Sequence, residues 1–423
     1  MERRVVITGL GVVAPNGVGL DAFTNAIKNG VSGIKHDAEL ERLKFSCQVS
    51  GTPEISEELK REYFTELELR NFNSTGILYG VIAGMDAWKD ADLPILQNEN
   101  PDWDSGTIFG TGTSGIEKFR ESIYKIDDFE TRKLGSTAVA QTMNSGVSAY
   151  LGGKLGLGNQ VTTNSSACTT GTESILMAYE RIKLGHAKRM IAGSTSDSGP
   201  YIWGGFDAMK VCTFKHNETP EKASRPMSAT ASGFVPGSGA GALVLEDLDS
   251  ALARGVRIYA EVLGGNVNSG GQRGLGTMTA PNPIAVQKCI TDAIANAGIT
   301  SDEIDAVNGH LTATSKDSLE IENWSKALGR KGKDFPYINS LKSMVGHCLS
   351  ASGSVESVAS VLQVYNGFIF PTINCEDLNK EITDSIDESK IPQRLIQKDI
   401  TILAKASFGF GDINGCVIFK KYK

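Results

Sequence analysis

Cys168 stands where the sequence predicts that a strand gives way to a helix. Residues 161–163 are β-branched and favour a strand, residues 164–167 are short, and residues 168–185 have the spacing of an amphipathic helix that Gly185 ends. A helix N-terminus offers unpaired amides and the positive end of the helix dipole, which stabilise a thiolate, the form of cysteine that attacks carbonyl carbon. The alternative is a buried structural cysteine, and this turn alone does not decide between the two.

Two histidines occupy similar places in the chain. His310 follows a predicted strand at residues 306–307, and His347 follows the segment 339–346, before a helix-forming stretch. The loops at the carboxyl ends of strands in an open α/β sheet form its binding crevice, so the three side chains could converge. The alternative for a lone histidine in such a loop is a simple hydrogen-bonding role.

Two glycine-rich segments receive different interpretations. Residues 406–415 form another junction of strand and loop, whose backbone amides are free to line a pocket, and the alternative is an ordinary turn. Gly9-Leu10-Gly11 lacks the third glycine of a dinucleotide-binding fingerprint and predicts only a tight turn between strand and loop.

The elements that must position these residues alternate between strands and helices. The strand-like runs are Val5–Val13, Gly106–Gly110, Val161–Thr163, Arg189–Gly193, Gly241–Glu246, Ile258–Leu263, Ala306–Val307, Thr401–Ala404 and Cys416–Phe419. Helical spacing marks Phe72–Ala91 and Ile284–Ala297. This alternation predicts an α/β protein with mostly parallel sheets covered on both faces. The charged segment 247–256 is the predicted seam between two halves, residues 1–250 and 251–423.

Composition excludes several classes of protein. The chain has 423 residues, 40% hydrophobic residues and a formal charge of −7, which argues against disorder and against a protein that coats nucleic acid or an anionic membrane. No apolar run is long enough for a membrane-spanning helix. Seven cysteines without paired spacing argue against a disulfide framework or a structural zinc site and fit a reducing cytoplasm. The opening apolar run superficially resembles a secretory signal, but its β-branched residues favour a buried strand.

Motifs along the whole chain resemble those of one enzyme family. They are VVITGLGVVAPNG near the start, then SSACTTG, ASRP, GFVPGSGAG, LKSMVGHCLSASG and finally FGFGDIN. In this order they resemble the elongating β-ketoacyl-acyl-carrier-protein synthases, condensing enzymes with a Cys-His-His site. The resemblance implies a thiolase-like α/β fold with two pseudo-symmetric halves in layers ordered αβαβα.

The resemblance also implies roles for residues of the site. Cys168 matches the nucleophile that receives the acyl group, while His310 and His347 match the histidines that act on malonyl thioester as it loses carbon dioxide. Lys342 matches a lysine that orients its neighbours. The amides of Cys168 and Phe410 match the oxyanion hole, and Phe410 matches a gatekeeper that admits malonyl after acylation.

Further matches concern the substrate pocket. Thr312 and Thr314 match threonines that bind the pantetheine arm, and Asp317 and Glu320 match an acidic pair that we expect to be structural. The other predicted substrate-binding residues belong to the last glycine-rich segment: Phe408, Gly409, Gly411 and Asn414. No metal or resident cofactor is expected, because decarboxylation itself supplies the carbanion and phosphopantetheine arrives on the carrier protein.

Some motifs depart from the family pattern. Leu311 replaces a glycine beside His310 in a loop that is one residue shorter, which changes the expected pocket shape. Ser228, Ala231, Ser232 and Ser238 replace charged residues, so we expect an entrance network without its charge. In the gatekeeping loop Asp412 and Ile413 replace small or hydroxylated residues. These departures indicate a specialised branch that extends unusual or unsaturated chains in a secondary pathway.

The expected partner is an acidic acyl carrier protein, which a basic surface would bind. Lys210 and Lys215 occupy the stretch where family members carry docking cations, and Arg70 is the one cation kept in the other docking segment. Ordinary solvated surface charge is the alternative for the two lysines. By resemblance, the chain is expected to form a homodimer or a heterodimer with a chain-length-factor-like subunit.

The function predicted from the sequence is decarboxylative Claisen condensation, which elongates a fatty, polyketide or polyene chain by two carbons on malonyl-acyl carrier protein. One alternative is a chain-length-factor-like partner subunit, but such subunits usually lack the nucleophile. Another is a non-decarboxylating thiolase or a Cys-His-Asn condensing enzyme, which would use Asn414 and, in a thiolase, Cys416 as a second thiol.

Overall fold

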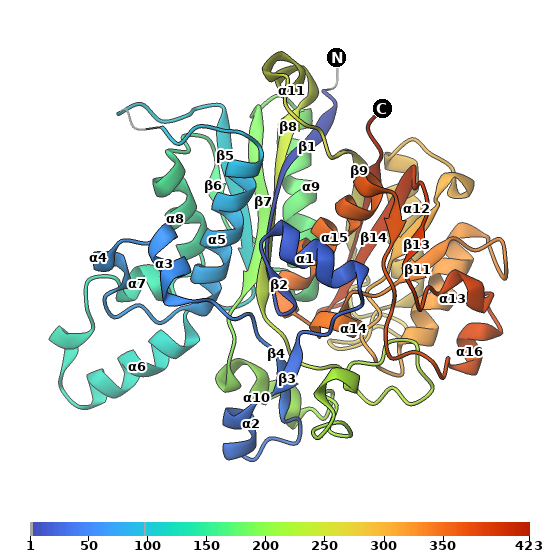
Figure 1. Cartoon of the computed structure of the whole chain (residues 1–423), viewed down its shortest axis with the longest axis horizontal. Helices are drawn as coiled ribbons and strands as arrows, with labels where there is room; N and C mark the ends of the chain where they lie inside the picture. The colour runs from blue at the N-terminus through green and yellow to red at the C-terminus, as the bar shows by residue number, and fades with distance from the viewer. Residues whose placement is uncertain (1–2, 97–98) are drawn as a thin grey trace.

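The computed structural model describes residues 3–96 and 99–423, so Met1 and Glu2 of the opening segment lie outside it. One sheet of eleven strands runs through the molecule (Figure 1), in the order β6-β5-β7-β8-β1-β9-β15-β14-β10-β11, with β2 paired to β1. Its strands are β1 (Val5–Ala14), β2 (Gly17–Val18), β5 (Ser105–Thr111), β6 (Val161–Thr162), β7 (Arg189–Ser196), β8 (Gly239–Asp247), β9 (Ala260–Ser269), β10 (Ala306–Asn308), β11 (Tyr337–Asn339), β14 (Ile402–Gly409) and β15 (Ile413–Lys420). Each strand-like run of the sequence falls on one of them.

The prediction of mostly parallel strands is wrong. Only the two ends of the sheet are parallel, where β5 pairs with β6 and β7 and where β10 pairs with β11 and β14. All the pairings between them are antiparallel. Every residue of β1 and nearly every residue of β8 is buried. Covered antiparallel strands are therefore as continuously apolar as parallel ones, and the sequence pattern cannot distinguish them.

The sheet has the same strand arrangement when it is followed inward from either end. The order β6-β5-β7-β8-β1 is repeated as β11-β10-β14-β15-β9, with the same sequence of parallel and antiparallel pairs. Two helices, α9 (Thr170–Lys183) and α15 (Ser352–Asn366), contact each other and strands of both repeats, so they form a central layer. The outer layers are α5 (Thr75–Asp90) with α8 (Gly146–Leu155) and α12 (Pro283–Asn296) with α13 (Asp317–Leu328). The two five-strand repeats form the two β layers, one on each side of α9 and α15. Together with the central and outer helices they give the five layers αβαβα.

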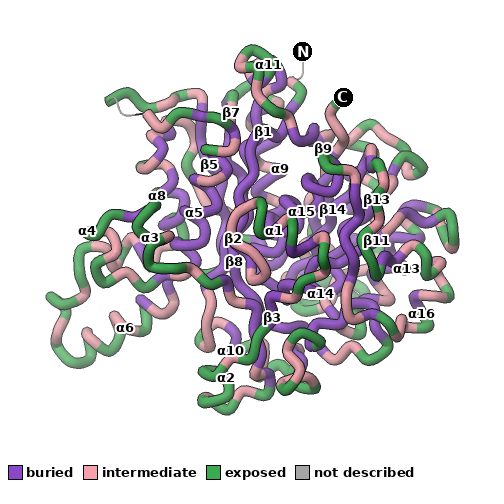
Figure 2. Tube along the Cα trace, viewed as in Figure 1, coloured by how far each residue is buried: buried purple, intermediate pink, exposed green. Residues whose placement is uncertain are grey.

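The remaining elements lie around this core. The helices are α1 (Leu20–Lys28), α2 (Ala38–Arg42), α3 (Glu57–Tyr63), α4 (Glu66–Leu69), α6 (Ile116–Asp127), α7 (Ala138–Thr142), α10 (Pro200–Ala208), α11 (Leu248–Arg254), α14 (Lys342–Val345) and α16 (Lys380–Thr383). The short strands are β3 (Ile34–His36), β4 (Val49–Gly51), β12 (Phe368–Ile369) and β13 (Ile396–Gln397). Figure 2 shows burial concentrated in the sheet and central helices, whereas α4 and α6 are largely accessible.

Gly9 and Gly11 serve packing rather than a turn. Both lie inside β1, where a Cβ at Gly9 would stand 2.1 Å from the Ala87 carbonyl oxygen and one at Gly11 1.9 Å from that of Ala83. Both carbonyls belong to α5, so the missing side chains let this helix touch the strand. The predicted turn between strand and loop is therefore wrong.

All seven cysteines are unpaired and buried. Within residues 3–96 and 99–423, no helix combines the length and the apolar character needed to cross a membrane.

Candidate active site

Cys168, His310 and His347 meet at one cavity. The Cys168 sulfur and one ring nitrogen of each histidine all lie within 4.8 Å of one another. Cys168 comes from the turn before α9, His310 from the loop after β10, and His347 from the turn between α14 and α15. The two imidazole rings stand nearly perpendicular, with their centroids 5.4 Å apart. The structure thus brings together the three side chains that the sequence analysis singled out.

The Cys168 turn is a 3₁₀ turn, residues Ala167–Thr169, that runs directly into α9. Ala167 has a φ of 50°, which is rare for a residue with a side chain and sharpens the turn. The Ser166 amide donates to the Thr170 hydroxyl oxygen at 2.9 Å. The Thr169 hydroxyl donates to the Ile413 carbonyl oxygen at 3.0 Å, which ties the turn to β15. Cys168 is thereby fixed at the start of the helix.

The expected resting thiolate is not supported. Burial raises the pKa of the Cys168 thiol to about 11, although the charge of Lys342 and the amides of Phe410 and Cys168 act in the opposite direction. Desolvation of the sulfur therefore outweighs the helix N-terminus and the nearby cation. The free site holds a thiol, whose proton must leave as the sulfur attacks.

The hydrogen bonds of His347 fix its tautomer. The Leu349 backbone amide donates to Nδ1 of His347 at 3.1 Å, and the Ser352 hydroxyl lies 3.0 Å from the same nitrogen. Because an amide N–H only donates, Nδ1 is an acceptor and the ring proton must be on Nε2. Burial, with Lys342 and Lys405 adding, holds the pKa of His347 well below its ordinary value. His347 is therefore a neutral ring with an Nε2–H donor.

His310 is also a neutral ring with its proton on Nε2, and Lys342 fixes this tautomer. The Lys342 Nζ lies 3.4 Å from Nδ1 of His310 and is also bonded to the Glu356 carboxylate. A Lys342 ammonium held by Glu356 can only donate to Nδ1, which places the proton of His310 on Nε2. Burial, followed by the charges of Lys342, His347 and Lys405, holds the pKa of His310 well below its ordinary value. The site thus contains two neutral Nε2–H donors.

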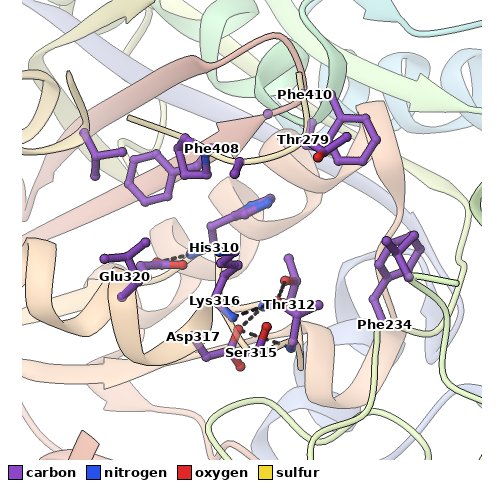
Figure 3. A pocket seen from close by; sticks show the side chains of 18 of the residues that line it. Phe234, Thr279, His310, Thr312, Ser315, Lys316, Asp317, Glu320, Phe408 and Phe410 are labelled. Atoms are coloured by element: carbon purple, nitrogen blue, oxygen red, sulfur yellow. Dashed lines mark hydrogen bonds between the residues drawn. The ribbon is translucent and has the colours of Figure 1, made fainter. Parts of the chain in front are cut away.

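Two buried carboxylates support the His310 loop. Glu320 accepts from the backbone amides of His310 and Leu311, both at 2.7 Å, as Figure 3 shows for His310. Asp317 accepts from the amides of Thr312 at 2.9 Å and Ala313 at 3.1 Å. Burial raises the pKa of Asp317 to about 6 and that of Glu320 to about 7.

The same loop contains strained backbone. Leu311 has a φ of 21° and Ala313 a φ of 61°, both in the region that favours glycine. The Leu311 side chain is fully buried, and its carbonyl oxygen accepts from the Ser340 hydroxyl at 2.9 Å. The loop therefore keeps a glycine-type conformation even though it lacks glycine, because Asp317 and Glu320 hold its amides.

The gatekeeping loop lies against the Cys168 turn. A Cβ at Gly409 would stand 3.2 Å from the Cys168 amide nitrogen, a tight contact that the missing side chain avoids. Phe408, Gly409 and Phe410 line the cavity. Phe410 packs beside Phe206, with their ring centroids 5.9 Å apart.

Gly411 and Asn414 do not line the cavity, which corrects their predicted contact with substrate. The Asn414 side-chain amide instead donates to the Asn268 side-chain oxygen at 3.0 Å, on the neighbouring strand. Asp412 is buried, and its carboxylate accepts from the amides of Asn282 at 2.7 Å and Gln272 at 3.0 Å. Asp412 and Asn414 therefore hold this loop in place without lining the cavity.

The cavity has a volume of about 400 Å³ and a mostly apolar lining. Thr312 and Thr314 lie on its wall with their hydroxyl oxygens 3.1 Å apart. Phe410, Thr279 and Glu320 also line the cavity, and Figure 3 shows the first two on the opposite side of the view from Glu320. Lys342 is outside the lining, behind His310. A small set of polar groups in an apolar cavity suits a thioester on a long flexible arm.

The predicted docking cations lie on the surface. Lys210 and Lys215 are exposed in the segment after α10, and their neighbour Val211 lines the cavity. Arg70 is exposed at the end of α4, a helix that Figure 1 places far from α10.

The expectation of an entrance network without charge is wrong. The Arg225 guanidinium forms ion pairs with Glu376 at 2.9 Å and Asp377 at 2.7 Å, and Asp377 also accepts from the Thr230 hydroxyl at 2.8 Å. Acidic residues from another part of the chain therefore partner this arginine, and the motif alone did not include them.

The sequence analysis missed two buried charged residues, Glu356 and Lys405. Glu356 lies on α15 and contacts Lys342, while Lys405 lies on β14, with its Nζ 2.7 Å from the second Glu356 oxygen. The available signal is a charged residue inside a run of small and apolar ones, as in SGSVESVASV and ILAKASF. A charge in such a run must find a buried partner.

Comparisons with known proteins cover the whole chain. The family descriptions "Beta-ketoacyl synthase, N-terminal domain" and "C-terminal domain" match residues 2–251 and 259–376. The chain is 32% identical to 3-oxoacyl-[acyl-carrier-protein] synthase 2 of Vibrio harveyi, over 99% of each protein. It is 33% identical to 3-oxoacyl-[acyl-carrier-protein] synthase 1 of Haemophilus influenzae, again over 99% of each.

Three solved structures superpose on this chain over their full length. A beta-ketoacyl synthase from Burkholderia phymatum superposes with a TM-score of 0.89 at 26% identity, covering 100% of both chains. A type II polyketide ketosynthase in complex with its acyl-carrier protein gives 0.87 at 27% identity, and the ishigamide ketosynthase/chain length factor gives 0.87 at 25%, both with the same coverage.

Proposed function

The chain belongs to the β-ketoacyl synthase family, and from this membership we propose that it catalyses decarboxylative condensation of an acyl thioester with malonyl-acyl carrier protein. The predicted family resemblance and thiolase-like fold are confirmed by the comparisons. The observation that carries the proposal is the convergence, within 4.8 Å, of the Cys168 sulfur and one ring nitrogen of each of two histidines whose hydrogen bonds leave Nε2–H as the donor. The division into halves at residues 250 and 251 remains a proposal, which the repeated strand order supports.

The first step loads the acyl group onto Cys168. The sulfur attacks the thioester carbonyl carbon, and the amides of Cys168 and Phe410 stabilise the negative oxygen that forms. The C–S bond to the carrier then breaks, and the carrier thiol leaves with the proton that Cys168 loses. Because the resting sulfur is protonated, this exchange consumes no external base.

The second step generates the carbon nucleophile from malonyl thioester. The bond between the α-carbon and the carboxylate breaks, carbon dioxide leaves, and the electron pair moves into an enolate. The Nε2–H groups of His310 and His347 donate to the thioester oxygen, where the negative charge develops. The enolate carbon attacks the acyl carbonyl carbon on Cys168, the C–S bond breaks, and the sulfur leaves as a thiolate. The thiolate then takes up one proton from solvent, which restores the resting thiol. Imidazolium rings could also donate, but burial beside Lys342 disfavours a further charge there.

Geometry argues against the thiolase-type alternative. Cys416 would have to serve as a second thiol, yet it is buried in β15 and does not line the cavity. Asn414 is turned toward Asn268. A chain-length-factor-like role is disfavoured because the nucleophile and both histidines are present. Pairing with such a subunit is still part of the proposal beside a homodimer, since one structural neighbour is a ketosynthase/chain length factor.

We propose that an acidic acyl carrier protein docks beside Lys210 and Lys215, next to the cavity wall at Val211. Phosphopantetheine would then enter on the carrier and pass Thr312 and Thr314, so no resident cofactor is proposed. Arg70, at the end of α4, is proposed as a separate contact. Unpaired cysteines support a cytoplasmic location.

Incubation of the protein with an acyl-carrier substrate is expected to leave the acyl group on Cys168. The other six cysteines are poor competitors, because none of them lines the cavity where the substrate would bind. Digestion and mass spectrometry locate the adduct, and hydroxylamine should release it, as it does other thioesters. An adduct on a different residue would contradict the assignment of the nucleophile.

A further inference from the structure

Lys405 is a fully buried lysine in the middle of the sheet, on the far side of Glu356 from Lys342. It belongs to β14, where it lies opposite Asn308 of β10 and Val417 of β15. It does not line the active-site cavity. A charge in this position is costly unless its hydrogen bonds are satisfied.

The surroundings of Lys405 satisfy an ammonium group. Its Nζ lies 2.7 Å from the second Glu356 oxygen, 2.8 Å from the Ser407 hydroxyl, and in contact with the Ala406 carbonyl oxygen. The Ser407 hydroxyl and the Ala406 carbonyl oxygen accept hydrogen bonds from the ammonium, whereas Glu356 pairs with it as an ion without a hydrogen bond. The Ser407 hydroxyl also lies 2.9 Å from that of Thr172 on α9, the helix that carries Cys168 at its start.

Glu356 connects Lys405 to the reacting groups. One Glu356 oxygen contacts Lys342 and the other contacts Lys405, and Lys342 in turn lies 3.4 Å from Nδ1 of His310. Lys342 and Lys405 therefore share one carboxylate behind the imidazole, and Glu320 is a further acidic group close to both lysines. The position of Lys342, and through it the tautomer of His310, therefore depends on a carboxylate that Lys405 anchors.

We propose that Lys405 is a positioning residue for decarboxylation: it fixes Glu356 against Lys342, so that Lys342 holds His310 with Nε2–H toward the substrate. The positive charges of Lys342 and Lys405 also favour the negative charge that moves onto the thioester oxygen. This inference rests on the proposed function of the site. It adds a second buried cation to a machinery for which the motifs indicated only Lys342.

The direction of the charge effect follows from the groups around His310. The ionisable groups facing His310 and Lys405 are Cys168, Glu320, Lys342, His347, Glu356 and Cys416. Lys405 acts to lower the pKa of both histidines. Removing its charge therefore raises these pKa values, and the acid limb of the decarboxylation profile moves to higher pH.

The test is Lys405→Met, which keeps an unbranched side chain that is one heavy atom shorter and removes the charge. We expect kcat for release of carbon dioxide from malonyl carrier to fall by about tenfold. The acid limb of the pH profile should shift to higher pH by roughly one unit. KM is expected to change by less than about twofold, because Lys405 does not touch the cavity. Loading of Cys168 should be nearly unchanged.

Lys118→Met is the matched control. Lys118 on α6 is also fully buried, but it pairs with Glu121 of the same helix and with the Asn71 carbonyl oxygen before α5, outside the active-site lining. It measures the cost of removing a buried ammonium in general. An unchanged pH profile in Lys405→Met, or an equal shift in Lys118→Met, overturns the inference. Failure of the wild-type protein to release carbon dioxide would instead contradict the proposed function.

Two further measurements remain decisive if Lys405→Met does not fold. Lys405→Gln retains a donor toward Glu356 and should shift the acid limb in the same direction. In the unmodified protein, ¹⁵N-histidine NMR is simplified because the chain has only five histidines. We expect His310 to carry its proton on Nε2, and a proton on Nδ1 would overturn the proposed linkage.

Discussion

Replacing His347 by Ala is expected to lower the rate of malonyl decarboxylation by about 10²–10³-fold, because one of two donors to the developing enolate oxygen is lost. His310→Ala should have an effect of the same size. Neither ring has to move a proton for the sulfur to exchange one thioester for another, so loading of Cys168 should be partly retained. The two rates are separable by trapped carbon dioxide and by mass spectrometry of the acyl-enzyme.

His216→Ala provides the control for this experiment. Its imidazole lies 3.2 Å from the Thr219 hydroxyl and does not line the cavity. It should decarboxylate malonyl carrier at the wild-type rate. If His310→Ala and His347→Ala do the same, the role assigned to the two donors is wrong.

Replacing Cys168 by Ala should separate the two half-reactions in the opposite sense. Acyl transfer is expected to disappear, since no other cysteine lines the cavity. The two Nε2–H donors remain, so malonyl carrier should still lose carbon dioxide, and its enolate should take up a proton to give acetyl carrier. Chromatography of the carrier species measures both outcomes.

Cys47→Ala is the matched control, because Cys47 is also buried but does not line the cavity. It should retain both half-reactions. An acyl-enzyme that still forms in Cys168→Ala would contradict the assigned nucleophile. Loss of decarboxylation together with acyl transfer would contradict the independence of the histidine pair.

The convergence of the three reactive residues could be predicted from sequence for a physical reason. Each stands where a strand or a short turn precedes a helix, and such junctions gather at one edge of an α/β sheet. Most strands of the sheet were predictable from their apolar runs, although β2 and β11 were not among the predicted strands. The direction of the strands was not predictable, because both faces of the sheet are covered.

The electrostatics of the site depended on contacts that no local pattern contains. The resting state of Cys168 follows from how completely the fold removes it from water, which outweighs the helix N-terminus. Glu356 and Lys405 meet across α15 and β14, almost fifty residues apart in the chain. Similarly, Arg225 finds Asp377 from a distant segment. These pairings require the tertiary structure.

The substitutions around His310 show how a departure from a motif can preserve geometry. Leu311 and Ala313 adopt positive φ angles, and the carboxylates of Glu320 and Asp317 hold their amides. The sequence led us to expect a changed pocket shape beside His310 but did not indicate that the backbone keeps a glycine-type conformation. The buried Leu311 side chain packs into the core of the C-terminal half rather than into the cavity.

A single-turnover reaction tests the central claim most directly. Protein carrying an acyl group on Cys168 is mixed with malonyl carrier labelled with ¹³C in the carboxylate and α-carbon. We predict one labelled carbon dioxide for each β-ketoacyl carrier formed, with the labelled α-carbon in the product. Condensation that retains the labelled carboxylate, or no condensed product from an intact acyl-enzyme, would contradict the account.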